Sequence, residues 1–513
     1  MGRLLEGRQR GLGRLSVLVL LLAAPSWGAE DASPALRDQW NALYLNGQKC
    51  GYERTVVRRI DEDGKVLYET KTHMEFAMGR GSLTLRFVSD KTIRESAEGR
   101  LVAFRFEDRQ GPVFKLTEGT VEGEQMVLKT GTALSSSAPA TYPAPKGLCP
   151  WALDRQRAQK GFKPGTRYTF PAFLPDFPNQ AVQGTCVVAG AETVEAGGEK
   201  RMLHRLDYTF DLLPGVDSRE WVDDDNTAWV TTVSMGPGLT LEARLVRREQ
   251  ALSRDDPADL LPAAFVPCDR PVVAPRTVEH LYLLMVPKEP GTAVAAPPSG
   301  PWQTVTEMQR GIHLAVRKAS PSPEKSYPIP YDGEEYAELL AANRWLETKD
   351  PVVAEMARTA VGDASDALAA ALRIEAYVHE AITSKDLSIG MATAAETARQ
   401  KAGDCTEHAV LVAGLARAAG IPSRVVEGLV YVDATPAGGP GFGYHMWAEA
   451  YVGEWLPLDA VFHGHDATHV ALGRSDLNSP DTLAGVTNIV ASFGRFTIRV
   501  LGAGEGPGLQ PAE

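Results

Sequence analysis

The hydrophobic pattern of this 513-residue chain changes near residue 334, and this change constrains the fold more than any other feature. Before it, apolar and polar residues alternate, as in SLTLRFV and LVAFRFED, which is typical of strands with one buried face. From there to about residue 399 the chain is rich in Ala and Leu at helical spacing. A long apolar helix and short strand-like stretches follow, such as SRVVEGLVYV. This order predicts a large antiparallel β domain followed by an α+β domain.

The first 28 residues have the features of a cleavable export signal. An arginine-rich start precedes the apolar run Leu15–Ala24, which is long enough for a signal-peptide core and too short to span a bilayer. Small residues at Ser26 and Gly28 make cleavage after Gly28 the expected event. A short buried helix is the alternative. We expect a periplasmic or secreted protein with no membrane span after cleavage.

The length of the chain predicts two or three domains, because one hydrophobic core rarely grows this large. Two Pro-rich stretches interrupt the strand-like half, at 135–150 and at 286–301, and the second resembles a linker or a long hairpin loop. The expected parts are a signal peptide (1–28), an antiparallel β-rich domain (29–275), a β- and Pro-rich connecting segment (276–333), an α+β domain (334–503) and a disordered tail (504–513).

If the protein is exported, its cysteines can be either free thiols or paired in disulfides. Their number, five, is odd, so at least one is free or paired between chains. In an oxidising compartment the first four could form two disulfides in three ways, and the sequence leaves this pairing open. Cys405 stands apart in the C-terminal third of the chain. The other four are Cys50, Cys149, Cys186 and Cys268.

Cys405 lies in the first turn of a predicted core helix. Asp404 can cap this helix, and Glu407 has the spacing of a capping box. Residues Ala409–Ala419 are apolar nearly all round, and Gly420 ends the helix. Unpaired backbone N–H groups and the helix dipole favour an anion at this position. A thiol placed there can become a thiolate nucleophile if a cation also approaches it.

A histidine and an aspartate in the following hairpin can complete such a site. A three-residue turn at 451–453, with Gly453 in the left-handed conformation, would place His445 across from Asp459 on the same face. Asp459 would then orient the imidazole of His445, as the third member of a nucleophile–base–orienter arrangement does. A two-residue turn at Gly453 and Glu454 is the alternative and would shift the pairing.

These elements resemble the transglutaminase-like superfamily, in particular its exported bacterial branch. The pattern is GDC, then GIPxR, HxW and a Trp-containing turn that leads to LD, and it covers roughly residues 334–480. The resemblance implies a papain-like α+β fold with Cys405 as nucleophile, His445 as base and acid, and Asp459 as its orienter. It also implies acyl transfer on amide bonds. The run YLNGQKCGY, from Tyr44, resembles the β domain that often precedes such cores.

Two further residues near the predicted site have alternative interpretations. His408 lies one turn after Cys405, where it is either a second base or, as we prefer, a buried histidine with a structural role. Trp447 shares a strand face with His445, and it either lines the substrate cleft or belongs to the core.

We expect no required metal and no other cofactor. Animal transglutaminases use calcium, but no loop here has the spaced Asp and Asn ligands of a calcium site, and VDDDN at 222–226 is too compact. Zinc ligation is the alternative, and two sets of residues could provide it. The set His463, His465 and His469 in HGHDATH lacks the spacing of ligands on a helix. The set Cys405, His408, His445 and Asp459 is better explained by the predicted triad.

The expected function is that of an exported, metal-independent cysteine enzyme acting on protein glutamine or peptide amides. A thioester at Cys405 would be resolved by water or an amine. The alternatives are a cysteine protease of the cell envelope and a non-catalytic envelope module that keeps the fold. Expected partners are a protein or peptide substrate and an envelope component, whereas the net charge of −12 argues against nucleic acid. The Cys405 backbone N–H is one expected oxyanion donor, and the second is expected around SIGMATAAETARQ, residues 388–400.

Overall fold

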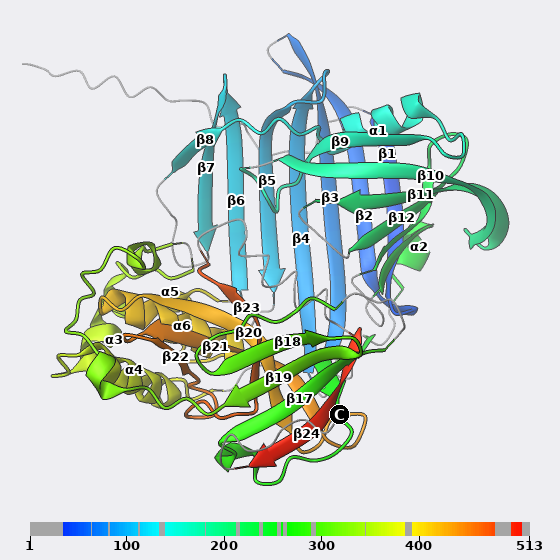
Figure 1. Ribbon diagram of the computed structural model, residues 1–513. Helices are drawn as coiled ribbons and strands as arrows, with labels where there is room; N and C mark the ends of the chain where they lie inside the picture. Colours follow the sequence, from blue (N-terminus) through cyan, green and yellow to red (C-terminus); the bar gives the residue numbers. More distant parts are fainter. Residues whose placement is uncertain are drawn as a thin grey trace, which may run out of the picture.

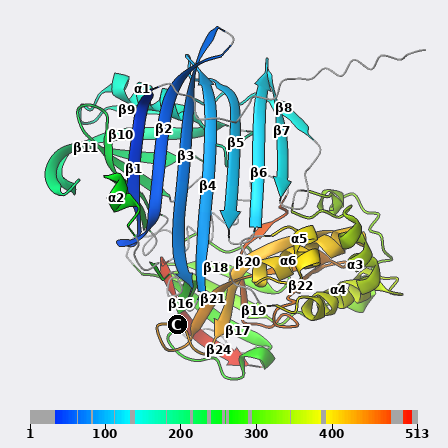
Figure 2. The same ribbon diagram turned by 180° about the vertical axis from the view of Figure 1, so that it is seen from behind.

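The computed structural model of the protein has two parts, a large β domain and a smaller part that combines helices with two sheets (Figures 1 and 2). The residues that the structure describes are 34–62, 64–80, 83–110, 113–132, 139–179, 181–211, 216–234, 240–253, 258–259, 264–288, 294–343, 345–384, 392–477 and 494–504. The predicted signal peptide and nearly all of the predicted tail lie outside these residues.

Within the described residues the β domain is one sheet of fifteen strands, and its neighbours are antiparallel except for the short β15, which pairs with β3 in parallel. This confirms the predicted antiparallel β domain. The elements are β1 (Ala35–Leu45), β2 (Gln48–Glu62), β3 (Lys65–Arg80), β4 (Leu83–Ser96), β5 (Leu101–Gln110), β6 (Val113–Glu122), β7 (Gln125–Thr132), β8 (Ala140–Pro143), α1 (Pro150–Lys160), β9 (Arg167–Phe173), β10 (Ala181–Ala196), β11 (Glu199–Phe210), β12 (Asp217–Val222), β13 (Ala228–Ser234), β14 (Thr240–Val246), α2 (Arg248–Ala251) and β15 (Ala258–Asp259).

This sheet folds over itself. Hairpins connect β1 to β8 and β9 to β14 in order, and the pairing of β1 with β14 joins the two series. Figure 1 shows β9–β12 crossing in front of β2–β4. The buried rings of Phe104 on β5 and Phe173 on β9 lie 5.3 Å apart in one apolar cluster, so side chains from the two series share a core.

The second part of the chain contains two further sheets and, among the described residues, four α-helices. One sheet has the order β16-β21-β20-β23 with β22 beside β21, and the other has the order β18-β19-β17-β24. The elements are β16 (Phe265–Pro267), β17 (His280–Pro287), β18 (Gln303–Met308), β19 (Gly311–Arg317), α3 (Pro351–Val361), α4 (Ala367–Ala381), α5 (Ala394–Gln400), α6 (Cys405–Ala418), β20 (Ser423–Val432), β21 (Gly441–Tyr451), β22 (Trp455–Leu458), β23 (His469–Ser475) and β24 (Phe496–Gly504), with short 3-10 turns at Pro275–Thr277, Pro323–Lys325 and Ala337–Leu340.

Two apolar clusters hold this part together. One joins helices α3–α6 to the sheet of β20–β22, with Leu411 and Val425 among its fully buried members. The other joins that sheet to the sheet of β17–β19 and β24, with Leu314 and Phe496 among its members. Figure 1 shows the helices at one end of this part and β24 at the other. The sheet of β20–β22 therefore lies in the middle, where both clusters fix its position.

The arrangement of strands bears on the expected domain ranges. β16 lies within the range 29–275, yet it pairs with β21 in the second part. The range 276–333 contains β17, β18 and β19, and the C-terminal β24 completes their sheet. We therefore propose that the boundary lies near residue 264 and that the segment expected as a connection is a layer of the C-terminal domain.

Capping side chains begin all four helices of the second part. Asp350 accepts a hydrogen bond from Val352 N at the start of α3, and Asp366 accepts one from Ala369 N at the start of α4. Helices α5 and α6 each begin with a capping box. Each cap satisfies backbone N–H groups that would otherwise lack an acceptor. The sequence therefore specifies where these helices begin.

The five cysteines are all free in the structure. Cys50, Cys149 and Cys186 lie in three different apolar clusters of the β domain, and Cys268 follows β16. The pairing that the sequence left open is therefore absent from this fold.

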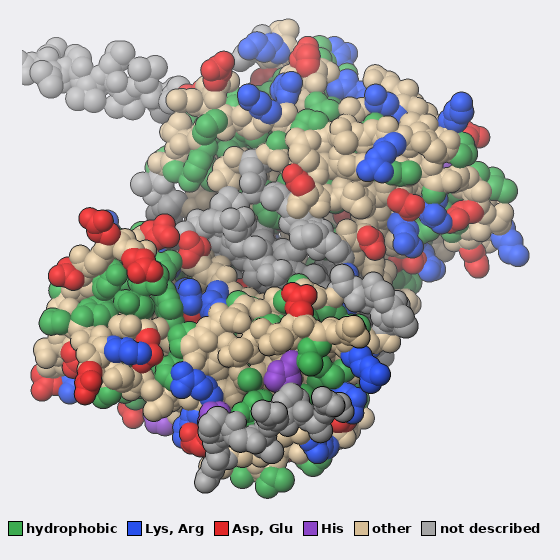
Figure 3. Space-filling view, in the orientation of Figure 1, with side chains coloured by type: hydrophobic (Ala, Val, Ile, Leu, Met, Phe, Trp, Pro, Cys, Tyr) green, Lys and Arg blue, Asp and Glu red, His purple; other side chains and the backbone are tan. Residues whose placement is uncertain are grey.

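The surface and the helices bear on the partners of the protein. Acidic and basic side chains are interspersed on the face shown in Figure 3, as expected for a protein of moderate negative charge. Across the described residues, no helix is both long enough and apolar enough to cross a bilayer.

Candidate active site

Cys405 is the first residue of α6, and the predicted capping box is confirmed there. Asp404 accepts a hydrogen bond from Thr406 N at 2.9 Å, and Glu407 accepts one from Asp404 N at 2.9 Å. The Cys405 side chain is partly exposed, as a thiol that meets a substrate must be. It lies at the positive end of the helix dipole, which stabilises a thiolate.

A buried carboxyl group fixes the chain just before Cys405. The two oxygens of Glu407 accept hydrogen bonds from Ala392 N at 3.0 Å and from Asp404 N. Burial, followed by the charge of Asp404, raises the pKa of Glu407 to about 8. Gly403 packs directly on this side chain, because a Cβ atom at residue 403 would lie 2.3 Å from the Cβ atom of Glu407. The glycine of the GDC motif is therefore required by packing as well as by its positive φ of 156°.

Gly403→Ala is expected to lower the free energy of unfolding by about 2–4 kcal/mol, since it adds both backbone strain and a steric clash. Urea unfolding of the variant and the wild type measures this loss. Gly438→Ala is the matched control, because Gly438 also has a positive φ, of 84°, but has no atom within 4 Å of the added Cβ. Equal losses in the two variants would contradict the packing argument.

The hairpin that carries His445 has a register two residues away from the predicted one. Tyr451 pairs with Trp455 and Ala448 pairs with Leu458, so the turn is 452–454. Gly453 has a positive φ of 97°, as predicted, but it occupies the middle of the turn. The expected direct pairing of His445 with Asp459 is therefore wrong.

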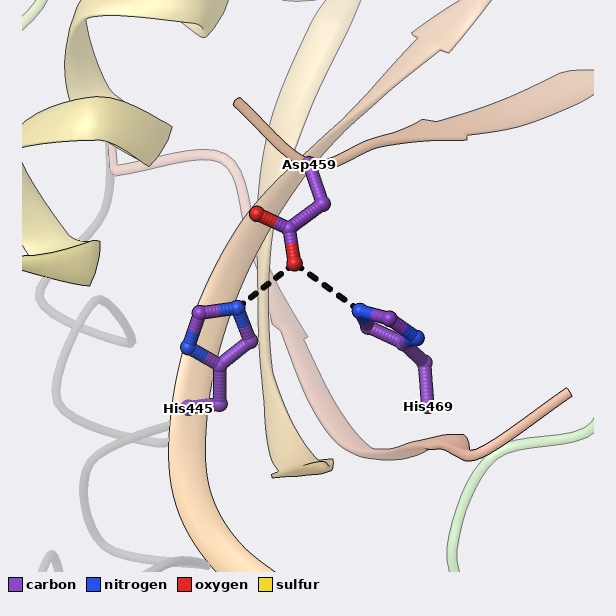
Figure 4. Close-up of side chains that lie close together, drawn as sticks. All are labelled: His445, Asp459 and His469. Atoms are coloured by element: carbon purple, nitrogen blue, oxygen red, sulfur yellow. Dashed lines mark hydrogen bonds and ion pairs between the residues drawn. The ribbon is translucent and has the colours of Figure 1, made fainter. Parts of the chain in front are cut away.

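The two side chains nevertheless meet, because a shift of two residues keeps both on one face of the sheet. β22 ends at Leu458, and Asp459 follows it at a position diagonal to His445. Asp459 Oδ2 lies 2.7 Å from His445 Nε2 (Figure 4). The two residues thus form a buried, hydrogen-bonded pair.

The Asp459 carboxylate is held on all sides. Its Oδ1 atom accepts hydrogen bonds from Val461 N at 2.8 Å and Phe462 N at 3.3 Å. Its own backbone N–H donates to Glu375 Oε1 on α4 at 2.6 Å. Such a carboxylate keeps one orientation, which allows it to fix the imidazole of His445.

Asp459 and His445 each shift the pKa of the other towards the charged form. Burial opposes the charged form of His445, but Asp459 and then the Cys405 side chain outweigh it and raise the pKa of His445 to about 9. Burial also opposes the charged form of Asp459, but its two histidine neighbours hold its pKa well below the usual range. Burial raises the pKa of Glu375 to about 7. The site therefore favours an imidazolium at His445 near neutral pH.

The structure brings the three predicted residues together. Nε2 of His445 is bound to Asp459, so Nδ1 is the ring nitrogen left for Cys405, whose side chain interacts with this imidazole. Cysteine, histidine and aspartate are thus connected in the order that thiolate chemistry requires.

A second histidine, whose role the sequence did not reveal, binds the same carboxylate. His469 Nε2 lies 2.8 Å from Asp459 Oδ2, the oxygen that also contacts His445 (Figure 4). His469 is buried at the start of β23 and is the last residue of the DATH run. On the other side of its ring, Nδ1 lies 3.2 Å from Asp466 Oδ1. Arg276 Nη1 in turn binds Asp466 Oδ2 at 2.9 Å.

The alternative metal sites can be compared with this geometry. Among the described residues, the one group of three candidate ligands with atoms within 4.8 Å of one another is His445, Asp459 and His469. Both imidazoles approach the same carboxylate oxygen, at 2.7 and 2.8 Å, which are ordinary hydrogen-bond distances. His463 packs against the ring of His379 instead, with centroids 4.7 Å apart.

The other two candidate residues have structural contacts. His408 Nδ1 lies 2.6 Å from the Asp404 carbonyl oxygen within the same helix. Trp447 is only 2% exposed and packs beneath the site, with its ring centroid 6.1 Å from that of His445. These contacts favour the structural interpretation of both residues.

An exposed aromatic ring lies beside the imidazole, and sequence reasoning missed it. Phe462 is 40% exposed and makes an edge contact with His445 at a centroid distance of 5.3 Å. The guanidinium of Arg276 lies 4.5 Å from the Phe462 centroid. Phe462 follows the LD pair by three residues, so its position after Asp459 was the available signal.

The second oxyanion donor is not identified among the described part of 388–400. The N–H groups of residues 392–395 already have acceptors, which are Glu407, Glu396, the Trp345 carbonyl and Glu347. The first part of the stretch, residues 388–391, lies outside the described residues.

Glu427 is a buried acid on β20, the strand that pairs with the β21 of His445. It is 1% exposed, neither carboxyl oxygen has a hydrogen-bond partner among the residues that the structure describes, and its cross-strand neighbours are Met446 and Gly473. Burial raises its pKa to about 7. The folded protein thus holds this proton more tightly than the unfolded chain, so stability falls as the pH rises from about 4.5 to 7.

Glu427→Met is expected to raise the free energy of unfolding at pH 8 by on the order of 3 kcal/mol, and by much less at pH 5, because it removes the cost of a buried charge. Urea unfolding at both pH values measures the difference. Glu355→Met, at an exposed position on α3, is the control and should show no such pH dependence. A gain at pH 8 no larger than that at pH 5 would refute the argument.

Comparison with known proteins adds a family assignment for part of the chain. Residues 354–460 match the model of the transglutaminase-like superfamily, which confirms the resemblance and shows a transglutaminase-like core near the C-terminus. No curated protein sequence matches the chain.

Several solved structures are similar at low identity. A protein from Cytophaga hutchinsonii named as a candidate cysteine protease is 14% identical over 43% of this chain and 82% of that chain, with a TM-score of 0.29. The periplasmic domain of TgpA from Pseudomonas aeruginosa is 16% identical over 38% and 87%, with a TM-score of 0.24. A β-barrel-like protein of unknown function from Brucella abortus is 13% identical over 41% and 95%, with a TM-score of 0.31. At these scores, the family match carries the assignment.

Proposed function

We propose that the protein is an exported cysteine enzyme that transfers the acyl group of a protein glutamine or peptide amide to water or an amine. The observation that carries this proposal is the meeting of Cys405, His445 and Asp459. Cys405 begins a capped helix, its side chain interacts with His445, and His445 is bound to Asp459 at 2.7 Å. This order of nucleophile, base and orienter suits thioester chemistry.

The reaction would proceed in two halves. The Cys405 thiolate attacks the amide carbonyl carbon, a C–S bond forms, and the carbonyl electron pair moves to oxygen. As this intermediate collapses, the C–N bond breaks and His445 gives its proton to the leaving nitrogen, which departs as ammonia or an amine. Water or an amine then attacks the thioester, His445 takes its proton, and the C–S bond breaks to restore the thiolate.

The residues around the triad suit this chemistry. The raised pKa of His445 favours the imidazolium that accompanies a thiolate at neutral pH. The exposed ring of Phe462 lies beside His445, and the half-exposed Arg276 lies over that ring, so both would contact the acyl donor. We propose a protein or peptide substrate, with an envelope component as a candidate partner, because residues 1–28 have the features of an export signal.

Alkylation of Cys405 by iodoacetamide tests the ion pair without knowledge of the substrate. In the mature protein, Cys405 is expected to react quickly near pH 6, and His445→Ala should abolish that reactivity. Cys268 is an internal control, since it is also partly exposed and burial raises its pKa to about 11. Peptide mass spectrometry reads both thiols in one sample. A Cys405 that reacts no faster than Cys268 near pH 6 would favour the non-catalytic envelope module.

A substrate panel separates hydrolysis from transfer. Ammonia release from glutamine-containing peptides, measured with and without a primary amine, reports attack on the side-chain amide, and incorporation of the amine reports transfer. Cleavage of the peptide backbone in the same samples would instead support the protease alternative.

A further inference from the structure

His469 is placed between two carboxylates. Its Nε2 atom lies 2.8 Å from Asp459 Oδ2. Its Nδ1 atom lies 3.2 Å from both Asp466 Oδ1 and the Asp466 carbonyl oxygen, and 3.3 Å from Asp466 N. The ring is fully buried, so water cannot take the place of either partner. A neutral imidazole carries a proton on one nitrogen only, whereas an imidazolium donates from both. Two oxygen acceptors lie nearer to Nδ1 than the one N–H group does, and a carboxylate oxygen lies at Nε2, so the geometry fits a His469 that donates from both nitrogens and is positively charged.

The charges around the ring are balanced in this state. Asp459 and Asp466 supply two negative charges, and His469 and Arg276 supply two positive ones, because Arg276 binds the second oxygen of Asp466. Thr468 also donates to Asp466 Oδ1, at 2.6 Å through its hydroxyl group. The Cys405–His445 pair can then form as a neutral unit of its own, without an uncompensated charge in the buried site.

We propose that His469 is a positioning residue, a buried imidazolium that holds the Asp459 carboxylate and limits how strongly that carboxylate attracts the proton of His445. The inference rests on the proposed function, since it concerns the same base. It assigns a role to the DATH run that the triad alone does not explain.

The expected sign of the effect follows from the charges. Without the positive charge of His469, Asp459 would have one cationic partner, so His445 would hold its proton to higher pH. The thiolate of Cys405 would also lose the attraction of a nearby cation, so it would form at higher pH. The ionisable groups around His469 are Asp459, Asp466 and His465 in the same loop, His445 on β21, Glu375 on α4 and, through Asp466, Arg276.

The chain offers a matched control for the charge. His465 lies half-buried in the same loop, with its ring centroid 4.9 Å from that of His469. Burial, followed by the charge of His469, lowers the pKa of His465 to about 3, so it is neutral near pH 7. His465→Gln therefore removes an uncharged imidazole from this loop, whereas His469→Gln removes a charged one.

The test is the pH profile of Cys405 alkylation in the wild type, His469→Gln and His465→Gln. The profile has two midpoints, one where the Cys405 thiolate forms and one where His445 loses its proton. In His469→Gln both are expected to lie about 1–2 pH units above those of the wild type, because the rings of His469 and His445 are only 6.0 Å apart. His465→Gln should leave both midpoints unchanged. A lower rate without a shift, or equal shifts in both variants, would overturn the inference alone. A wild-type Cys405 that titrates as an ordinary thiol would overturn the proposed function together with it.

A measurement on the wild type decides the matter if His469→Gln does not fold. In protein labelled with 15N-histidine, both ring nitrogens of His469 are expected to be protonated at pH 7, and those of His465 are expected to show a neutral ring. A neutral His469 at pH 7 would overturn the inference.

Discussion

Cys405→Ser is expected to lower kcat/KM on an amide substrate by at least about 10³-fold, the largest effect of any single change in this protein. A serine hydroxyl is far less acidic than a thiol, so the positive charge on His445 and the helix dipole can no longer produce the nucleophile. The fold should persist, because Cys405 is partly exposed and the cap of α6 depends on Asp404 and Glu407. The free energy of unfolding is expected to change by no more than about 0.5 kcal/mol.

Three further variants give this prediction its controls. His445→Ala should cost about as much activity as Cys405→Ser, and the double variant should be hardly worse, because the two residues act as one unit. Cys268→Ser should leave kcat/KM unchanged, since Cys268 lies after β16 and outside the site. A Cys405→Ser enzyme that keeps more than a tenth of the wild-type kcat/KM would contradict the assignment of the nucleophile.

Signals between neighbours in the chain predicted the structure around Cys405. The capping box of Asp404 and Glu407 depends on four consecutive residues, and Gly420, with a φ of 80°, follows α6 as its left-handed conformation requires. In such patterns the residues that interact are neighbours in the sequence, so the structure can be predicted without knowing the rest of the fold. The helix that presents the thiol was therefore predictable.

The contact of His445 with Asp459 was predicted through an incorrect register. Gly453 is compatible with more than one position in a tight turn, so its presence does not fix which residues pair. The contact survived because an error of two residues preserves the face of a strand, whereas an error of one would have reversed it. The sequence thus predicted that His445 and Asp459 lie on the same face of the sheet, but it did not predict which residues pair directly.

The outer part of the site, which contains Arg276 and Asp466, depends on contacts between residues far apart in the chain. No short sequence pattern predicts such contacts. Arg276 and Asp466 are 190 residues apart, and Arg276 belongs to a segment that the sequence suggested was a connection. The pairing of β16 with β21 and of β17 with β24 has the same character. Long-range pairings of this kind follow from packing of the whole domain, which a single sequence does not display.

Asp459→Asn is expected to be the most destabilising change in the site. The carboxylate accepts hydrogen bonds from four donors, two on each oxygen: the imidazoles of His445 and His469, and the backbone N–H groups of Val461 and Phe462. An asparagine has one oxygen, so either orientation turns its NH₂ group toward two donors. The change also leaves buried imidazolium charge without its partner. A loss of about 3–5 kcal/mol in the free energy of unfolding follows.

This loss should depend on pH in a defined direction. The pKa of Asp459 is lowered, so its contribution to stability is present above its unfolded pKa of about 3.9 and is lost as the pH falls. The pKa values of His445 and His469 are raised to about 9, so their contribution is complete below their unfolded pKa of about 6.5 and is lost as the pH rises through 9. The difference between wild type and Asp459→Asn is therefore largest between about pH 4 and 6.5.

Urea unfolding at pH 5.5 and pH 9.5 measures this window. Asp459→Asn should lose clearly more stability at pH 5.5, where both imidazoles are charged, than at pH 9.5, where they are largely neutral and need only an acceptor. Asp363→Asn is the matched control, because Asp363 is an exposed aspartate paired with Arg373 at the surface, and exposed pairs contribute little at either pH. If the loss at pH 9.5 equalled that at pH 5.5, Asp459 would act only as a hydrogen-bond acceptor, and the charges assigned to the two histidines would be wrong.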